Sequence, residues 1–237
     1  MSIFTETFPK FIRKELKDRQ DRLVNPNKRS ELITYQSTRN AWVRMTSGVE
    51  VDDKPNLAKQ YVLQGGTIDD KNKFKIGLGN SFTNNIYSYS GTSGQYDRGI
   101  RPMPGITSIS AECKTAYGSL FEATVNFVCW DIKQLEDLEL LFMRPGYTVL
   151  LEWGWAYQGQ TPQFYDILSD KNVPLDFQKT YKDLFDHCEK NKGNYEAILG
   201  YVKNYSWSAR PDGGYNCITH IIAIGEVLES LKINYAP

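Results

Sequence analysis

Apolar and polar residues alternate along the middle of the chain with a regular period. Residues 107–114 and 120–129 read as two strands joined by a turn at 116–119. The second strand has an apolar face made of Phe121, Ala123, Val125, Phe127 and Cys129. Its other face is mostly polar and carries Leu120, Glu122, Thr124, Asn126 and Val128. A period of two with one apolar face predicts a hairpin that is buried on one side only.

The period changes to that of a helix at Asp131, a residue type suited to capping a helix N-terminus. Apolar residues then recur at helical spacing, at Ile132, Leu135, Leu138, Leu141 and Phe142. Pro145 and Gly146 end this helix, and residues 147–153 form an apolar strand that only Glu152 interrupts. The central unit is therefore predicted to be hairpin, helix and strand.

The N-terminal region predicts an amphipathic helix over residues 1–24, with a stripe of Phe8, Phe11, Ile12 and Leu16 after Phe4. Two interpretations stay open: the helix packs on its own domain, or it is an arm that docks on a neighbouring subunit. Acidic residues offset its lysines and arginines, which disfavours a basic membrane-surface helix. Residues 25–40 are polar with a turn at 25–27, and strands are expected at 41–45 and 58–63, the latter ending at Gly65 and Gly66.

Residues 67–104 are poor in apolar residues and rich in glycine, asparagine and serine. The glycine spacing around 77–80 does not match a phosphate-binding loop. Tyr87, Tyr89 and Tyr96 favour a surface that contacts another subunit and becomes buried on assembly.

The C-terminal region predicts a helix over residues 173–192 and then a long hairpin. Its arms are residues 195–209 and 215–224, and the turn at 210–214 contains Asp212 and Gly213, a strong hairpin signal. His187 and Cys188 lack a further ligand at metal-binding spacing and are interpreted as packing residues. Hairpins with a packed helix give an antiparallel α+β fold, and such a sheet exposes its edges unless it closes or pairs with a neighbour.

Composition narrows the possible functions. The chain has 237 residues with 28 basic and 28 acidic side chains, so the global basic charge of a nucleic-acid-binding protein is missing. The four cysteines are widely spaced and form no CxxC pair, which favours buried thiols over disulfides or a zinc site. We therefore expect no cofactor and no metal. The sequence predicts no membrane span and no export signal, and synthesis in a cytoplasm is expected.

Several segments resemble phage tail structural proteins: residues 102–107, 118–125, 141–154, 212–215 and 224–232, and more weakly 39–47 and 61–66. The family is that of the baseplate hub and tail-tube-like proteins of contractile tails or related injection systems. The resemblance divides the chain into an N-terminal part, 1–102, and a tail-tube-like domain, 103–237. Only one tube-like copy is recognisable where a hub often carries two, so a tube initiator or another baseplate component is the alternative.

The resemblance implies a structural protein without catalysis, located in the virion tail or baseplate and assembled in the host bacterial cytoplasm. It implies a trimeric or hexameric ring that meets tube, spike and wedge proteins, with DNA passing through the channel without stable binding. Subunit contacts are then expected at Phe4, Phe8, Phe11, Tyr87, Tyr89 and Tyr96. The polar residues expected to line the channel are Glu122, Thr124, Asn126, Lys203, Ser206 and Ser208.

A competing hypothesis is a glycan site around Glu152, which is flanked by aromatic residues at Trp153, Trp155 and Tyr157. A carboxylate beside exposed aromatic rings is typical of carbohydrate binding, and hydrolysis would need a second carboxylate nearby. The simpler alternative is that Glu152 forms an ion pair with an arginine such as Arg144.

Overall fold

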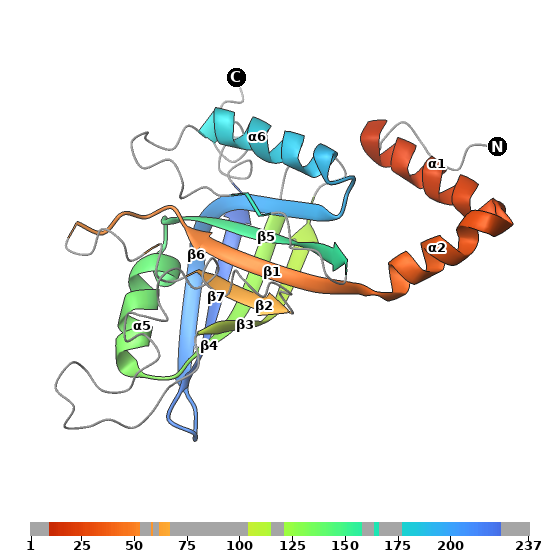
Figure 1. The fold of residues 1–237 in the computed structure, drawn as a ribbon. Coiled ribbons are helices and arrows are strands. Elements are labelled where there is room, and N and C mark those ends of the chain that lie inside the picture. Colours follow the sequence, from red (N-terminus) through yellow and green to blue (C-terminus); the bar gives the residue numbers. More distant parts are fainter. Residues whose placement is uncertain are drawn as a thin grey trace.

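A computed structural model describes residues 10–52, 58, 62–66, 104–114, 121–157, 164–165 and 177–223. Its helices are α1 (Lys10–Val24), α2 (Pro26–Ser37), α5 (Ile132–Leu138), the π-helical turn η2 (Glu139–Met143) and α6 (Phe177–Lys190). Its strands are β1 (Arg39–Ser47), β2 (Leu63–Gly66), β3 (Gly105–Cys113), β4 (Phe121–Cys129), β5 (Thr148–Tyr157), β6 (Tyr195–Ala209) and β7 (Tyr215–Ala223). Figure 1 shows the strands gathered into one curved sheet, with the α1–α2 segment projecting from it.

The sheet has seven strands in the order β2-β1-β5-β6-β7-β4-β3, and every recorded pairing is antiparallel. The predicted α+β class is confirmed. The sheet curls until its two outer strands approach each other near Gly65 of β2 and Ile106 of β3. A curled sheet has a concave inner face and an outward face, and the two faces of this one differ in chemistry.

The inner face holds the main core. Fully buried residues on it include Met45, Val125, Phe127, Leu151 and Ile221. Helix α5 and η2 fill the concave side, and Asp131 caps α5 by accepting a hydrogen bond from the Gln134 backbone N–H at 2.8 Å. The predicted cap and most of the predicted helical stripe are confirmed, but Ile132 is 55% exposed and does not belong to the core.

On the outward face, α6 covers part of β1, β5 and β6. Leu184 of α6 belongs to a second apolar cluster with Trp42, Leu150, Tyr195 and Leu199. The helix ends at Lys190, and the turn that follows it contains Gly193, whose φ of 75° suits glycine. The outward face of the remaining strands is polar.

Helix α2 and strand β2 differ from the predictions. Residues 26–37 form helix α2, because Asn25 and Pro26 act as N-cap and first helical residue instead of as a turn. Strand β2 begins at Leu63 and includes Gly65 and Gly66, while Ala58 is helical. Gly65 suits this part of the strand because β2 lies close against β3 there, and a side chain would not fit.

Gly65→Ala is expected to lower the free energy of unfolding by about 1–3 kcal/mol, because overpacking at a rigid contact is destabilising. A Cβ at Gly65 would lie 2.7 Å from the Ile106 carbonyl oxygen and 2.9 Å from Val43 Cγ1. The matched control is Gly48→Ala, where the nearest atom would be at 3.4 Å. Urea unfolding measures both, and an equal effect at the two positions would contradict the close approach of β2 to β3.

Candidate functional site

The candidate site is the outward face of β6, β7, β4 and β3, here called the polar panel. The strand registers place its side chains in rows that cross all four strands. One row contains Ser108, Asn126, Ile218 and Ser206. The next contains Ser110, Thr124, His220 and Asn204. The opposite face of β4 and β7 is buried core, whereas both faces are mostly exposed along β3 and along residues 203–209 of β6.

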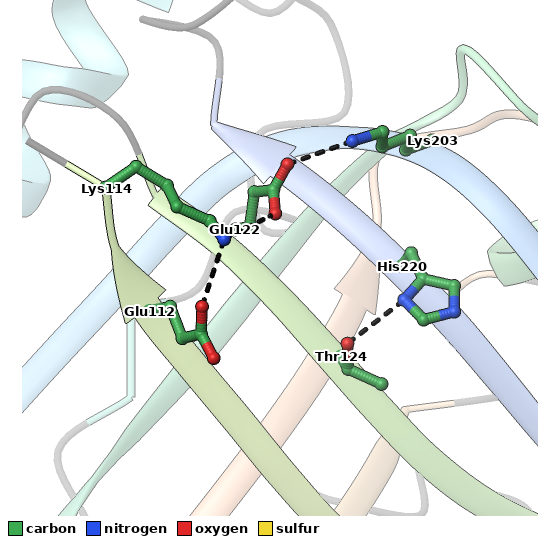
Figure 2. Close-up of polar contacts among 6 residues, drawn as sticks. All are labelled: Glu112, Lys114, Glu122, Thr124, Lys203 and His220. Carbon is green, nitrogen blue, oxygen red and sulfur yellow. Dashed lines mark hydrogen bonds and ion pairs between the residues drawn. The ribbon is translucent and has the colours of Figure 1, made fainter.

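Four charged side chains form a connected network at one end of the panel (Figure 2). Lys203 Nζ lies 2.9 Å from Glu122 Oε1, and Lys114 Nζ lies 3.3 Å from Glu122 Oε2. Lys114 also contacts Glu112 Oε2 at 3.0 Å. The hydrogen bonds from Lys203 and then Lys114 lower the pKa of Glu122, and those to Glu112 and Glu122 raise the pKa of Lys114. The two lysines and two carboxylates therefore balance one another's charge.

Neutral polar side chains also bond to one another across the strands of the panel. Thr124 Oγ1 and His220 Nδ1 are 3.0 Å apart, as Figure 2 shows. Asn126 donates through Nδ2 to Ser108 Oγ at 3.0 Å. These cross-strand bonds hold the side chains against the sheet and produce a hydroxyl- and amide-rich surface.

The structure brings all the predicted channel-lining residues to this panel. Glu122, Thr124 and Asn126 come from β4, and Ser206 and Ser208 from β6. Lys203 lies at a bulge between Val202 and Asn204 and reaches the panel through its contact with Glu122. Their role in lining a channel remains a prediction.

The panel has open edges on both sides among the residues that the structure describes. Strand β5 pairs with β6 only as far as Tyr201, and two further backbone bonds join Val202 N–H to the Tyr147 carbonyl and Gly146 N–H to the Val202 carbonyl. Beyond Val202, the backbone pairing recorded within the described ranges joins residues 204–209 to β7. Likewise, β3 pairs with β4, and β2 approaches it only around Ile106. Unpaired strand edges are sites where another strand can add.

Glu152 does not belong to an accessible site. Its side chain is fully buried, and it pairs with Arg44 of β1 at 3.5 Å. It also accepts hydrogen bonds from the Tyr195 hydroxyl at 2.9 Å and the Tyr165 backbone N–H at 2.7 Å. The expected pairing with Arg144 is wrong: Arg144 lies 3.8 Å from Glu139.

The aromatic residues expected beside Glu152 point away from it. Successive side chains of a strand face opposite sides, so Trp153 and Trp155 lie on the other face of β5. Arg44 is instead covered by the Phe164 ring, 4.7 Å from the guanidinium carbon. The structure therefore does not assemble the carboxylate and aromatic rings that carried the glycan hypothesis.

The predicted subunit contacts are only partly described. Phe4, Phe8, Tyr87, Tyr89 and Tyr96 lie outside the described residues. Phe11 contacts Phe185 of α6 in the same chain, edge to face with ring centroids 6.0 Å apart. His187 packs against Tyr195 at 4.4 Å, in agreement with a packing role. Cys129 and Cys217 are buried as expected, whereas Cys113 is exposed and Cys188 is half-buried.

Sequence reasoning missed several members of the panel, namely Ser108, Ser110, Glu112, Lys114 and His220. The sequence shows the polar alternation of β3, but the pairing of β3 with β4, and of β4 with β7, depends on strand registers that a single sequence does not contain. Within the described part of the chain, no three His, Cys, Asp or Glu residues gather as a metal-binding group. In the same ranges, every helix is too short or too polar to cross a membrane.

Lys203→Gln is expected to raise the pKa of Glu122 toward its ordinary value, because the largest cause of its lowering is the bond from Lys203. A carboxylate with a lowered pKa stabilises the fold above its unfolded-state pKa, and this contribution is lost as the pH falls through the folded-state value. An NMR titration of the Glu122 side chain measures the shift. Lys133→Gln on α5 is the control, and a similar shift in both variants would contradict the network.

No protein-family model matches the sequence, and no curated protein matches it. Among solved structures, the chain has a distant likeness to a chain of the Francisella PdpA–VgrG complex in a half-lidded state. The likeness covers 100% of this chain and 26% of that chain, with 10% sequence identity and a TM-score of 0.33. The chain thus spans about a quarter of the length of the protein it matches. Similarity at this level does not transfer a function.

Proposed function

We propose that the chain is a structural subunit of a contractile injection machine, such as a phage tail baseplate, and that it acts by assembly and not by catalysis. Copies join edge to edge into a ring, and the polar panels form the wall of its channel. The observation that carries this proposal is a polar panel whose back is buried core on β4 and β7, and whose outer strands, among the described residues, pair on one side only over part of their length. A ring removes such edges by pairing each with its neighbour.

The directions of the strands support this joint. Strands β6, β7, β4 and β3 alternate in direction, so β6 and β3 run opposite ways. Copies related by rotation about an axis along the strands therefore set β3 of one against β6 of the next in antiparallel pairing. In a joint without offset, the registers set residues 108–110 of β3 against residues 204–206 of β6, so this joint is three residue pairs long. With no offset between copies, the row of Ser108 continues into the row of Ser206 across the joint.

The same joint is electrostatically favourable. Glu112 lies near one end of the open stretch of β3, and Lys203 lies at the corresponding end of β6. A joint without offset places this carboxylate and this ammonium group near each other. The channel wall carries balanced charge and many hydroxyl and amide groups, which suits DNA that passes without being held, because stable binding to phosphates needs unpaired cations.

In this proposal the ring is a trimer or hexamer that continues the tail tube and meets spike and wedge proteins. The chain is synthesised in the bacterial cytoplasm and becomes part of the virion. A hub and a tube initiator share these features, and the sequence resemblance supports both.

The test combines native mass spectrometry and negative-stain imaging of the chain, alone and with the proteins encoded beside it. Two neighbouring variants in β3, Ser110→Pro and Ala111→Pro, sharpen it. Backbone N–H groups point alternately to the two sides of a strand, so one proline removes a bond to β4 and the other blocks only the open edge. The variant that keeps its circular dichroism and melting temperature should lose ring formation. A wild-type chain that stays monomeric with its neighbours, or a folded proline variant that still forms rings, overturns the proposal.

A further inference from the structure

The segment α1–α2, residues 10–37, is here called the helical arm, and it is only partly packed: Leu32 of α2 is 3% exposed, but much of the apolar surface of the arm is uncovered. Within α1 no residue is buried. Leu23, Val24 and Ile33 are 47%, 73% and 55% exposed, which is unusual for apolar residues on two helices that contact each other. Figure 1 shows the arm projecting from the sheet, with one end of α1 directed toward α6. The arm therefore has apolar surface that its own chain does not cover in the described residues.

The arm meets the rest of the described chain at one end of α1. Phe11 packs edge to face against Phe185 of α6. Ile12 Cδ1 lies 3.2 Å from the position that a Cβ on Gly193 would occupy, so the glycine gives the isoleucine room. Phe185 and its helical neighbour Tyr181 remain 52% and 48% exposed. Helix α6 therefore presents an aromatic acceptor surface that fits the end of α1 and is only partly used.

The connection between the arm and the sheet is short. Helix α2 ends at Ser37 and β1 begins at Arg39, so Thr38 alone separates them. Thr38 bonds to the Thr34 carbonyl through both its backbone N–H and its hydroxyl, which completes the helix end without involving the sheet. A change of backbone angles at this residue redirects the whole arm and leaves both the arm and the sheet intact.

We propose that the helical arm is exchanged between neighbouring copies in the assembled ring. The end of α1 from one copy lies on α6 of the next, and the contact between Phe11 and Phe185 forms between chains. This inference rests on the proposed homo-oligomer, because a second copy carries the same acceptor. Exchange of an identical element gives up a small contact within the chain and regains it between chains, so it costs little. It also ties each subunit to its neighbour at a second point, away from the strand joint.

Cysteine cross-linking between differently tagged chains tests the exchange. One chain carries Phe11→Cys and the other Phe185→Cys, both with Cys113→Ser and Cys188→Ser to remove the exposed and half-buried thiols. After co-expression, assembly and mild oxidation, a disulfide between positions 11 and 185 of these chains can form only in trans. We expect it to be the main product, and a single chain with both substitutions should yield a ladder of linked subunits. The control replaces Phe11→Cys with Val24→Cys, which lies about 20 Å farther along α1 and should not cross-link.

Native mass spectrometry of the same samples separates the possible outcomes. Rings with cross-links between chains support the exchange. Rings in which the doubly substituted chain links only within itself overturn the exchange and leave the proposed ring standing. A monomer that links only within itself overturns both. Equal cross-linking by the Val24→Cys control would show random collision and also overturn the exchange.

Discussion

Replacing Glu152 with alanine is expected to lower the free energy of unfolding by about 3–5 kcal/mol, because it leaves a buried arginine without its counter-charge. Arg44 is only 4% exposed and lies between the sheet and the ring of Phe164. The same substitution removes the acceptor of the Tyr195 hydroxyl and of the Tyr165 backbone N–H. Burial, followed by the neighbouring Glu152 carboxylate, raises the pKa of Tyr195, so this hydroxyl stays a hydrogen-bond donor through the physiological range.

Two further variants separate the cost of an unpaired charge from the cost of a lost side chain. Glu139→Ala breaks the exposed pair with Arg144 and should change stability by less than about 1 kcal/mol. The double variant Arg44→Leu with Glu152→Leu should recover most of the loss, because no charge is left buried. Urea unfolding followed by tryptophan fluorescence measures all three. If Glu152→Ala is no worse than Glu139→Ala, the buried pair is not formed in solution.

Phe142→Ala is expected to lower the free energy of unfolding by about 3–5 kcal/mol, through lost apolar contact and the cavity left behind. Phe142 is fully buried in η2, at the centre of the concave core. Its carbonyl oxygen also accepts a hydrogen bond from the buried Thr219 hydroxyl at 3.0 Å, which ties the helix to β7.

The matched control for this prediction is Ile132→Ala on the same helical segment. Ile132 is more than half exposed, so its truncation should change stability by no more than about 0.5 kcal/mol. Thermal and urea unfolding give both values. Similar losses at positions 132 and 142 would mean that the helix packs on the sheet through a different face from the one seen here.

Local periodicity predicts most of the secondary structure because the signals for each helix, strand and turn lie within its own residues. The apolar face of β4, the cap at Asp131 and the hairpin turn at Asp212 and Gly213 all depend on neighbours in the sequence. Asn25 and Pro26 show the limit of this reasoning, since the same dipeptide can make a turn or begin a helix.

The partner of Glu152 was mispredicted for a different reason. A carboxylate in an apolar strand indicates an ion pair with an arginine, but the sequence does not show which arginine lies opposite it. The register of β1 with β5 sets Arg44 directly opposite Glu152. Pairing between strands more than 100 residues apart is a property of the whole fold. The polar panel was likewise predicted strand by strand, and its rows became visible only when β3, β4, β7 and β6 were placed side by side.

The bulge in β6 is a position where the strand can lose one residue without changing which face its other side chains occupy. Val202 lies opposite Ile221 and Asn204 lies opposite His220, so Lys203 is an extra residue in the ladder. Deleting Lys203 would leave a regular strand in which every later side chain keeps its face, whereas a deletion between Tyr205 and Ala209 would turn the residues that follow it to the wrong side. Insertion or deletion of one codon can therefore add or remove this lysine, and with it one charge of the panel. The alternation of inward and outward side chains along β6 is kept.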